Sequence, residues 1–153
     1  TKEHWPFVDS TSSIPFSSAQ RLLRSVQPDL TRTVSGLAFY ILEAAEFSPD
    51  AVVLTHNNVH LFCAETYPTV HEDVDEEYPY VAKVVDGRAV DMCTTVRRSE
   101  RAAAAGVETA EAYQGNGFAF DVSNVRAKTI LEEGRVAFYS TFWDNQASRR
   151  VAE

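Results

Sequence analysis

The stretch EAYQGNGFAFD, residues 111–121, places two glycines and two side-chain amides between a strand-like and a helix-like segment. Gly115 and Gly117 lack a Cβ, so a ligand can approach their backbone closely. The first N–H groups of a helix have no partner within it, and together with the positive end of the helix dipole they attract anions. The pattern therefore predicts a phosphate site built from backbone N–H groups.

Three known phosphate-binding loops can be compared with this stretch. A Walker A loop requires Gly-Lys-Ser/Thr, and the absence of Lys excludes it. A dinucleotide-binding loop requires G-x-G-x-x-G, but position 120 is Phe. A third pattern, Gln/Arg-x-x-Gly-x-Gly/Ala, is matched in register by Gln114, Gly117 and Ala119. Taken alone, this match also fits a purely structural turn.

Composition narrows the classes of function. The chain has 153 residues, 44% of them hydrophobic and 24% charged, which indicates one globular domain, or one domain with an added subdomain. A formal net charge of −8 argues against a nucleic-acid surface. No apolar run approaches the ~20 residues of a membrane helix, and no secretory signal opens the chain. Cys63 and Cys93 are expected to be buried free thiols, and we expect a cytoplasmic protein without nucleic-acid or membrane partners.

The elements that would position the loop lie in the second half. Residues 80–96 form two alternating runs joined by Asp86-Gly87, a strong hairpin signal, and residues 102–110 predict a third, antiparallel strand. Apolar spacing after the loop predicts a helix that ends at Gly134. A strand over 135–143 and a last helix capped by Asp144 or Asn145 follow.

The first half carries no motif that names a ligand. It predicts a helix over 17–27, strands over 36–44 and 51–55, and a helix that starts at Asn57 or Asn58 and stops at Pro68. We interpret residues 70–79 as an acidic linker with a solvated surface, not as a metal site. The predicted organisation is thus 1–69, the linker 70–79, and 80–153. The element order predicts an α/β or α+β fold, with a mixed, mostly antiparallel sheet and helices on both faces.

Two separated stretches in this order, GVETAEAYQGNGFA and AFYSTFWDNQASRRVAE, resemble the acetyl-CoA-binding core of the GCN5-related N-acetyltransferase (GNAT) superfamily. The resemblance covers roughly residues 80–153. It implies acetyl-CoA as co-substrate, no metal, and a small-molecule or peptide amine as acceptor, with specificity for the acceptor in residues 1–69. A homodimer is left open.

The resemblance also implies roles for individual residues. The loop would hold the CoA pyrophosphate, and the strand before it would pair with the pantetheine arm where it splays from its parallel neighbour. Asn145 is implied to bind the pantetheine or adenosine end, although it could equally be only a helix cap. The expected cofactor-binding residues are Val107, Thr109, Gln114, Gly115, Asn116, Gly117, Phe118, Ala119, Asn145 and Ser148.

Transfer of an acetyl group to an amine requires removal of a proton from that amine. Glu108 and Glu111 are the carboxylates nearest the expected site, and Glu108 is the predicted catalytic residue because it lies within the strand. An exposed strand residue, or a partner for Arg97 or Arg98, is the alternative interpretation of Glu108.

Two departures from the family pattern favour other functions. The loop carries no Arg or Lys, and Ala152 stands where members often carry a Tyr that protonates the leaving thiolate. The sequence given also ends before the last two strands of the family, so the protein is longer or its sheet is completed differently. A non-catalytic CoA-binding module is therefore the alternative to an enzyme, and a small interaction domain without ligand is a third hypothesis.

Overall fold

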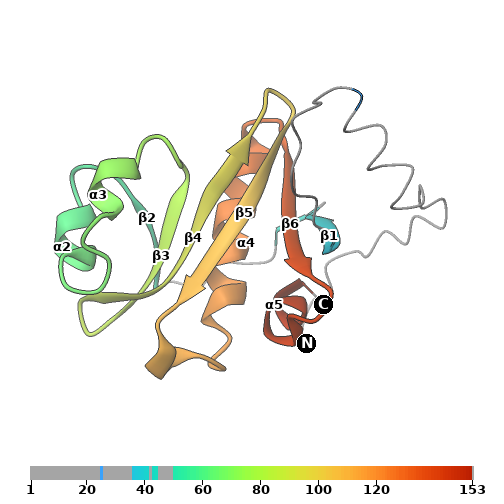
Figure 1. Ribbon diagram of the computed structural model, residues 1–153. Coiled ribbons are helices and arrows are strands. Elements are labelled where there is room, and N and C mark those ends of the chain that lie inside the picture. The colour runs from blue at the N-terminus through green and yellow to red at the C-terminus, as the bar shows by residue number, and fades with distance from the viewer. Residues whose placement is uncertain (1–24, 26–35, 42, 45–49, 153) are drawn as a thin grey trace.

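A computed structural model of the protein describes residues 25, 36–41, 43–44 and 50–152. Its strands form one sheet in the order β1-β6-β5-β4-β3-β2 (Figure 1). All neighbouring strands are antiparallel except β5 and β6, which are parallel. The strands are β1 (Gly36–Ile41), β2 (Ala51–Leu54), β3 (Tyr80–Val85), β4 (Arg88–Arg98), β5 (Ala102–Thr109) and β6 (Val136–Phe142).

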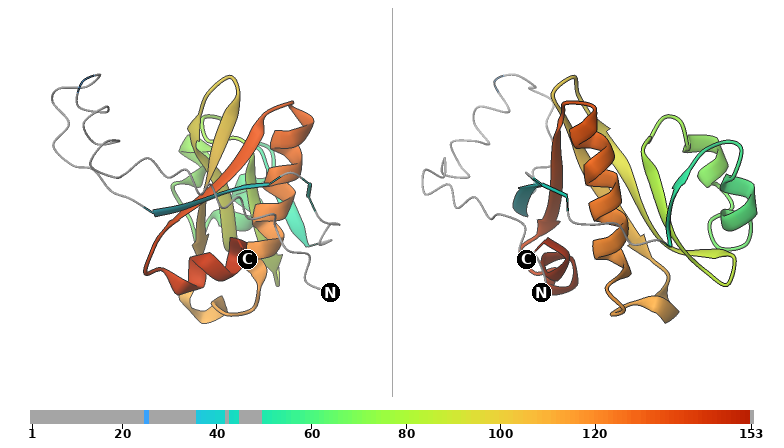
Figure 2. Two further views of the ribbon diagram at one scale, coloured as in Figure 1. Left: turned by 90° about the vertical axis from the view of Figure 1, so that its right-hand side faces the viewer. Right: turned by 180° about the vertical axis from the view of Figure 1, so that it is seen from behind.

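Helices cover both faces of this sheet. Successive residues of β3 pack on opposite faces of the sheet. Val81 packs in the hydrophobic cluster under α4, whereas Tyr80 and Ala82 pack with α2. Figure 2 shows α4 lying along one face and α2 and α3 gathered at the β2–β3 end. The helices are α2 (Val59–Cys63), α3 (Val70–Asp73), α4 (Phe118–Glu132) and α5 (Gln146–Ala152). The fold class predicted from the sequence is confirmed.

The strongest local signals of the sequence are also confirmed. Asp86 and Gly87 both have positive φ, 50° and 76°, as a two-residue type I′ hairpin requires. At the end of α4 the Gly134 N–H bonds Leu131 O and the Arg135 N–H bonds Ile130 O, which is the Schellman pattern expected around a C′ glycine. Cys63 and Cys93 are free and buried, and burial raises the pKa of each thiol to about 11.

The first half of the chain departs more from its predictions. β1 ends at Ile41 rather than near residue 44, and α2 ends at Cys63 although the sequence predicted a helix up to Pro68. Asn58 is the N-cap residue of α2, but its side chain accepts the Thr55 N–H at 2.7 Å and donates to Val53 O at 3.0 Å, so it stabilises the preceding turn. The helix predicted over 17–27 lies outside the described residues except for Ser25.

The acidic segment 70–79 is more structured than a linker. It begins with α3, and its two valines, four residues apart, face the interior at Val70 and Val74, which is fully buried. These valines pack in the α2-side cluster with Leu54 and Met92. The sequence analysis did not anticipate this short helix, although the two valines stand at helical spacing within the acidic run. The division of functions among 1–69, 70–79 and 80–153 stays a prediction.

At the far edge of the sheet, β1 pairs antiparallel with β6, from Gly36↔Phe142 to Ile41↔Ala137. The edge of β6 is therefore covered by a strand from the first half of the chain. Gly36 permits this contact, since a Cβ at that position would lie 2.1 Å from Thr141 O.

Candidate functional site

The loop between β5 and α4 has the backbone conformation that its glycines predict. A single 3-10 turn, η1 (Glu111–Tyr113), leads to an extended Gln114. Gly115 and Gly117 then adopt φ values of 82° and 81°, a left-handed conformation that other residues rarely adopt. Gly117 is the N-cap residue of α4, so the loop opens directly onto the first turn of that helix.

The backbone N–H groups of this loop divide into two sets. Those of Tyr113, Gln114 and Phe120 bond Ala110 O, Glu111 O and Gly117 O respectively. In the part of the chain that the structure describes, no acceptor bonds the N–H groups of residues 115–119. No atom lies within 4 Å of a Cβ built on Gly115 or Gly117. The loop therefore presents unpaired donors next to open space at the positive end of α4.

Side chains within the loop stabilise its shape. Asn116 Nδ2 donates to Tyr113 O at 2.8 Å, which closes the turn over the two glycines. The rings of Tyr113 and Phe118 lie across the loop with centroids 6.5 Å apart. The Asn116 amide is therefore bonded to its own loop, which leaves the backbone as the source of donors for a ligand.

The strands on either side of α4 separate close to this loop. β5 and β6 pair only from Ala102↔Val136 to Ala105↔Tyr139, and residues 106–109 of β5 have no partner strand on the β6 side within the described residues. Figure 1 shows the two strands together at one end and far apart at the other. The main chain of β5 beyond Ala105 is thus available for pairing with an extended ligand, as the resemblance implied.

Glu108 lies on the opposite face of β5 from Val107 and Thr109. Val107 packs against the cluster under α4, and Thr109 faces Asp91, whereas Glu108 is exposed and paired in register with Met92 on the α2 side. No ion pair joins Glu108 to Arg97 or Arg98 among the described residues; Arg98 instead pairs with Glu133. Glu108 is thus a solvent-accessible carboxylate beside the unpaired end of β5.

A neighbour of Glu108, Tyr67, was not identified from the sequence. Burial raises the pKa of Tyr67 to about 12, with a smaller contribution from the negative charge of Glu108. Its hydroxyl is buried without a hydrogen-bond partner in the described part of the chain. Tyr67 follows α2 in a segment where the sequence predicted only the end of a helix, so no signal marked it.

Asp91 is a second residue that the sequence analysis missed. It is fully buried on β4, and its Oδ2 accepts a 2.6 Å hydrogen bond from Thr109 Oγ1. Burial raises the pKa of Asp91 to about 6, although the bond from Thr109 opposes the rise. The Thr109 hydroxyl is therefore already bonded within the protein, and Thr109 can offer a ligand its main chain. A carboxylate inside the apolar run RAVDMC was the available signal.

Lys83, a buried residue of β3, places a positive charge against the start of α4. Its Nζ lies 3.0 Å from Asp121 Oδ2, 3.5 Å from Asp50 Oδ2 and 5.2 Å from the centroid of the Phe118 ring. These contacts hold the first turn of α4 on the sheet. They also bring the positive charge of Lys83 beside the glycine loop, which itself contains no Lys or Arg.

Asn145 and Ser148 bond within the protein at the start of α5. Asn145 Oδ1 accepts the Ser148 N–H at 3.0 Å, so Asn145 does cap the helix. Ser148 Oγ lies 2.6 Å from the hydroxyl of Tyr139, the last residue of β6 that pairs with β5. A role of Asn145 and Ser148 in ligand binding stays a prediction.

Among the described residues, no three His, Cys, Asp or Glu side chains gather as a metal site requires. None of the described helices has the length and apolar character needed to cross a membrane.

Comparisons with known proteins bear on the fold. No protein-family model and no curated protein sequence matches this chain. Among solved structures, a GNAT-family acetyltransferase from Novosphingobium aromaticivorans is similar with a TM-score of 0.58 and 18% identity over 78% of this chain. One from Colwellia psychrerythraea gives 0.57 and 17% over 78%, and a GCN5-related N-acetyltransferase-like protein from Streptococcus suis gives 0.53 and 16% over 88%.

This chain spans 58%, 50% and 61% of those three proteins, respectively. At such identities the likeness concerns the fold alone, and it agrees with the mixed six-stranded sheet flanked by helices. The chain has the fold of the GCN5-related N-acetyltransferases.

Proposed function

We propose that the protein is an acetyl-CoA-dependent N-acetyltransferase that transfers an acetyl group to a primary amine. The observation that supports this most directly is the separation of β5 from β6 after Ala105↔Tyr139, beside a loop whose N–H groups at 115–119 have no acceptor in the described residues. An extended thioester with a diphosphate at one end matches both features.

The residues present fit such a ligand. Unpaired N–H groups at a helix N-terminus suit a diphosphate, and the absence of a Cβ at Gly115 and Gly117 leaves the backbone open to it. The unpaired main chain of residues 106–109 suits an extended pantetheine arm, which would add to β5 as an extra strand. Acetyl-CoA, when bound, supplies the acetyl group in the activated form of a thioester.

In this proposal Glu108 removes the proton from the acceptor amine, directly or through water. Its exposure keeps it accessible to an acceptor that arrives from the α2 side of the sheet. Backbone N–H groups of β5 beyond Ala105 polarise the carbonyl that the amine attacks. Residues 1–69 would supply acceptor specificity. The net charge of −8 favours a cationic acceptor, so KM for such an acceptor should rise as salt is added.

A non-catalytic CoA-binding module is the second candidate. Two observations favour it: the loop itself is neutral, and Ala152, which is buried, cannot protonate a leaving thiolate. This candidate predicts binding of CoA without turnover.

Two measurements separate these functions. Saturating CoA should raise the melting temperature, because a ligand that binds only the folded state stabilises it. An unchanged melting temperature would instead favour an interaction domain without ligand. Release of free thiol from acetyl-CoA is then followed across amino acids, polyamines, small amines and peptides. Turnover on any amine supports the enzyme, whereas stabilisation without turnover supports the module.

A further inference from the structure

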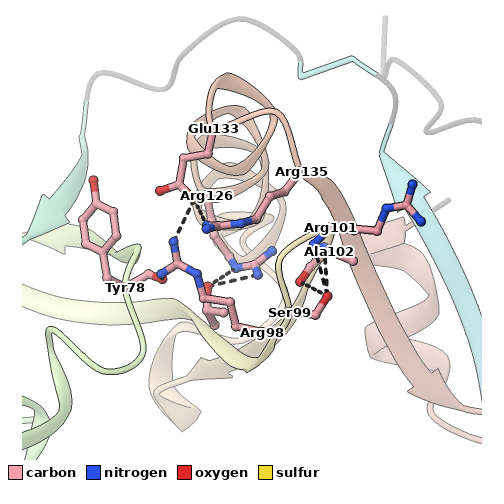
Figure 3. A network of polar contacts seen from close by, with 9 residues as sticks. Tyr78, Arg98, Ser99, Arg101, Ala102, Arg126, Glu133 and Arg135 are labelled. Carbon is pink, nitrogen blue, oxygen red and sulfur yellow. Dashed lines mark hydrogen bonds and ion pairs between the residues drawn. The ribbon is translucent and has the colours of Figure 1, made fainter.

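Three arginines gather around one carboxylate at the end of α4 opposite the glycine loop. Arg98 comes from β4, Arg126 from α4 and Arg135 from the turn before β6, and the shared carboxylate is Glu133 (Figure 3). We call these four residues the arginine cluster. α4 has 15 residues, so about 22 Å of helix separates Glu133 from the glycine loop.

Glu133 is shared by two of the arginines. Its Oε2 lies 2.9 Å from Arg98 Nη2 and also accepts a hydrogen bond from Arg135 Nη1. The side chains of Arg98, Glu133 and Arg135 are 33%, 27% and 24% exposed, so solvent reaches them only partly. Three positive charges and one negative charge leave a surplus of two positive charges in a chain whose net charge is −8.

Arg126 lies beneath this pair and is fully buried. Its Nε and Nη2 donate to the Thr95 hydroxyl at 3.2 and 3.0 Å, and Nη1 has no acceptor in the described part of the chain. Burial lowers the pKa of Arg126, and the nearby charge of Arg98 adds to the effect. A buried guanidinium whose bonded partner is a neutral hydroxyl favours further negative charge close by.

The geometry points to a second anion site, in which the carboxylate of Glu133 occupies the place of the ligand. A phosphate dianion, free or as a small monoester, would displace Glu133 and take the hydrogen bonds of Arg98 and Arg135. Guanidinium groups bind such oxyanions in a fork-like manner. Arg126 would act through its charge from below. The site is independent of the proposed function, because it shares no residue with the glycine loop.

The chain offers a matched control for this site. Arg101 lies in the turn between β4 and β5, within the same part of the molecule, but its side chain points away from the other arginines (Figure 3). Arg98→Gln and Arg101→Gln remove the same charge, and both positions are on the surface. Glu133→Gln removes the internal competitor and keeps the shape of the side chain.

The test is a titration with inorganic phosphate at constant ionic strength, followed by NMR signals of the arginine Nε–H groups and of the Gly115 and Gly117 amides. A second arm uses glycerol phosphate to distinguish a free ion from a monoester. We expect saturable shifts at Arg98 and Arg135, roughly ten-fold weaker binding in Arg98→Gln, several-fold tighter binding in Glu133→Gln and no change in Arg101→Gln.

Four results would overturn the proposal. The first is shifts that chloride reproduces at the same ionic strength. The second is equal weakening by Arg98→Gln and Arg101→Gln, since this would indicate general charge rather than a site. The third is weaker binding in a folded Glu133→Gln variant, because Glu133 would then not compete with the ligand. Shifts confined to the Gly115 and Gly117 amides would also overturn it.

Discussion

Thr109 donates a 2.6 Å hydrogen bond from Oγ1 to Asp91 Oδ2 across the β4–β5 pair, where the two residues are in register. The other oxygen of Asp91, Oδ1, is buried and has no partner in the described residues. The strand that leads to the glycine loop is thus joined to a carboxyl that has no contact with solvent. The charge on this carboxyl should influence the stability of the whole sheet.

We expect Asp91→Asn to remove a pH dependence of stability. Burial, aided slightly by the charge of Asp121, raises the pKa of Asp91 from 3.8 to about 6. Because the pKa in the folded state is the higher one, the contribution of Asp91 is fully present below about pH 4 and is lost as the pH rises to about 6. A difference of about two pKa units corresponds to ~3 kcal/mol, which sets the upper limit of the loss.

Denaturant unfolding of both proteins between pH 4 and pH 8 measures this effect. Relative to the wild type, Asp91→Asn should gain stability as the pH rises, by ~1–3 kcal/mol at pH 7. Lys83 and Asp121 face the same side of the sheet, so their variants should be measured under the same conditions. If the unfolding free energies of the two proteins differ by the same amount at every pH, Asp91 ionises normally.

Gly117→Ala should weaken CoA binding more than its strain alone explains. Gly117 has φ 81°, so any other residue is strained there by roughly 1–2 kcal/mol. Gly87 has φ 76° in the β3–β4 hairpin, outside the glycine loop, and serves as the matched control. Both alanine variants should lose similar stability, but only Gly117→Ala should raise the Kd of CoA, measured by calorimetry. An equal effect of both variants on the Kd would argue against the loop as the phosphate site.

The sequence predicted the second half of the fold well because its signals are local. Asp86-Gly87 determines a turn by its φ angles, and Gly134 ends α4 where apolar spacing stops. The glycine loop was likewise recognisable, since the left-handed conformation of Gly115 and Gly117 follows from the missing Cβ. Such features depend on a few neighbouring residues, so they can be predicted without knowledge of the tertiary fold.

The features that escaped prediction depend on contacts between distant segments. Asp91 and Thr109 are 18 residues apart, and their bond exists only because β4 and β5 pair in one particular register. The pairing of β1 with β6 joins the two halves of the chain, and no local sequence pattern predicts it. Tyr67 reaches the surroundings of Glu108 through the packing of α2 on the sheet. A residue pattern cannot supply these distances.

Glu108→Gln should lower kcat while leaving CoA affinity unchanged, if the protein is an acetyltransferase. Removal of a general base commonly costs a factor of at least 100. Glu111→Gln is the matched control, because Glu111 is also exposed and lies three residues away in η1. Glu111→Gln should keep the kcat of the wild type. If Glu108→Gln keeps the kcat of the wild type, the general base must be another group or water.

Gly106→Ala tests how closely β4 and β5 pack where β6 departs. A Cβ at Gly106 would lie 2.4 Å from Val96 Cγ1, far inside contact distance. Val96 has few alternative rotamers because it is β-branched, so the clash should cost ~1–3 kcal/mol. Val96→Ala removes the clashing methyl, and since Val96 is half exposed this change alone should cost little. Unfolding free energies of the two single variants and the double variant form a thermodynamic cycle. The double variant should regain most of the stability that Gly106→Ala loses, whereas additive losses would mean that the strain at Gly106 arises elsewhere.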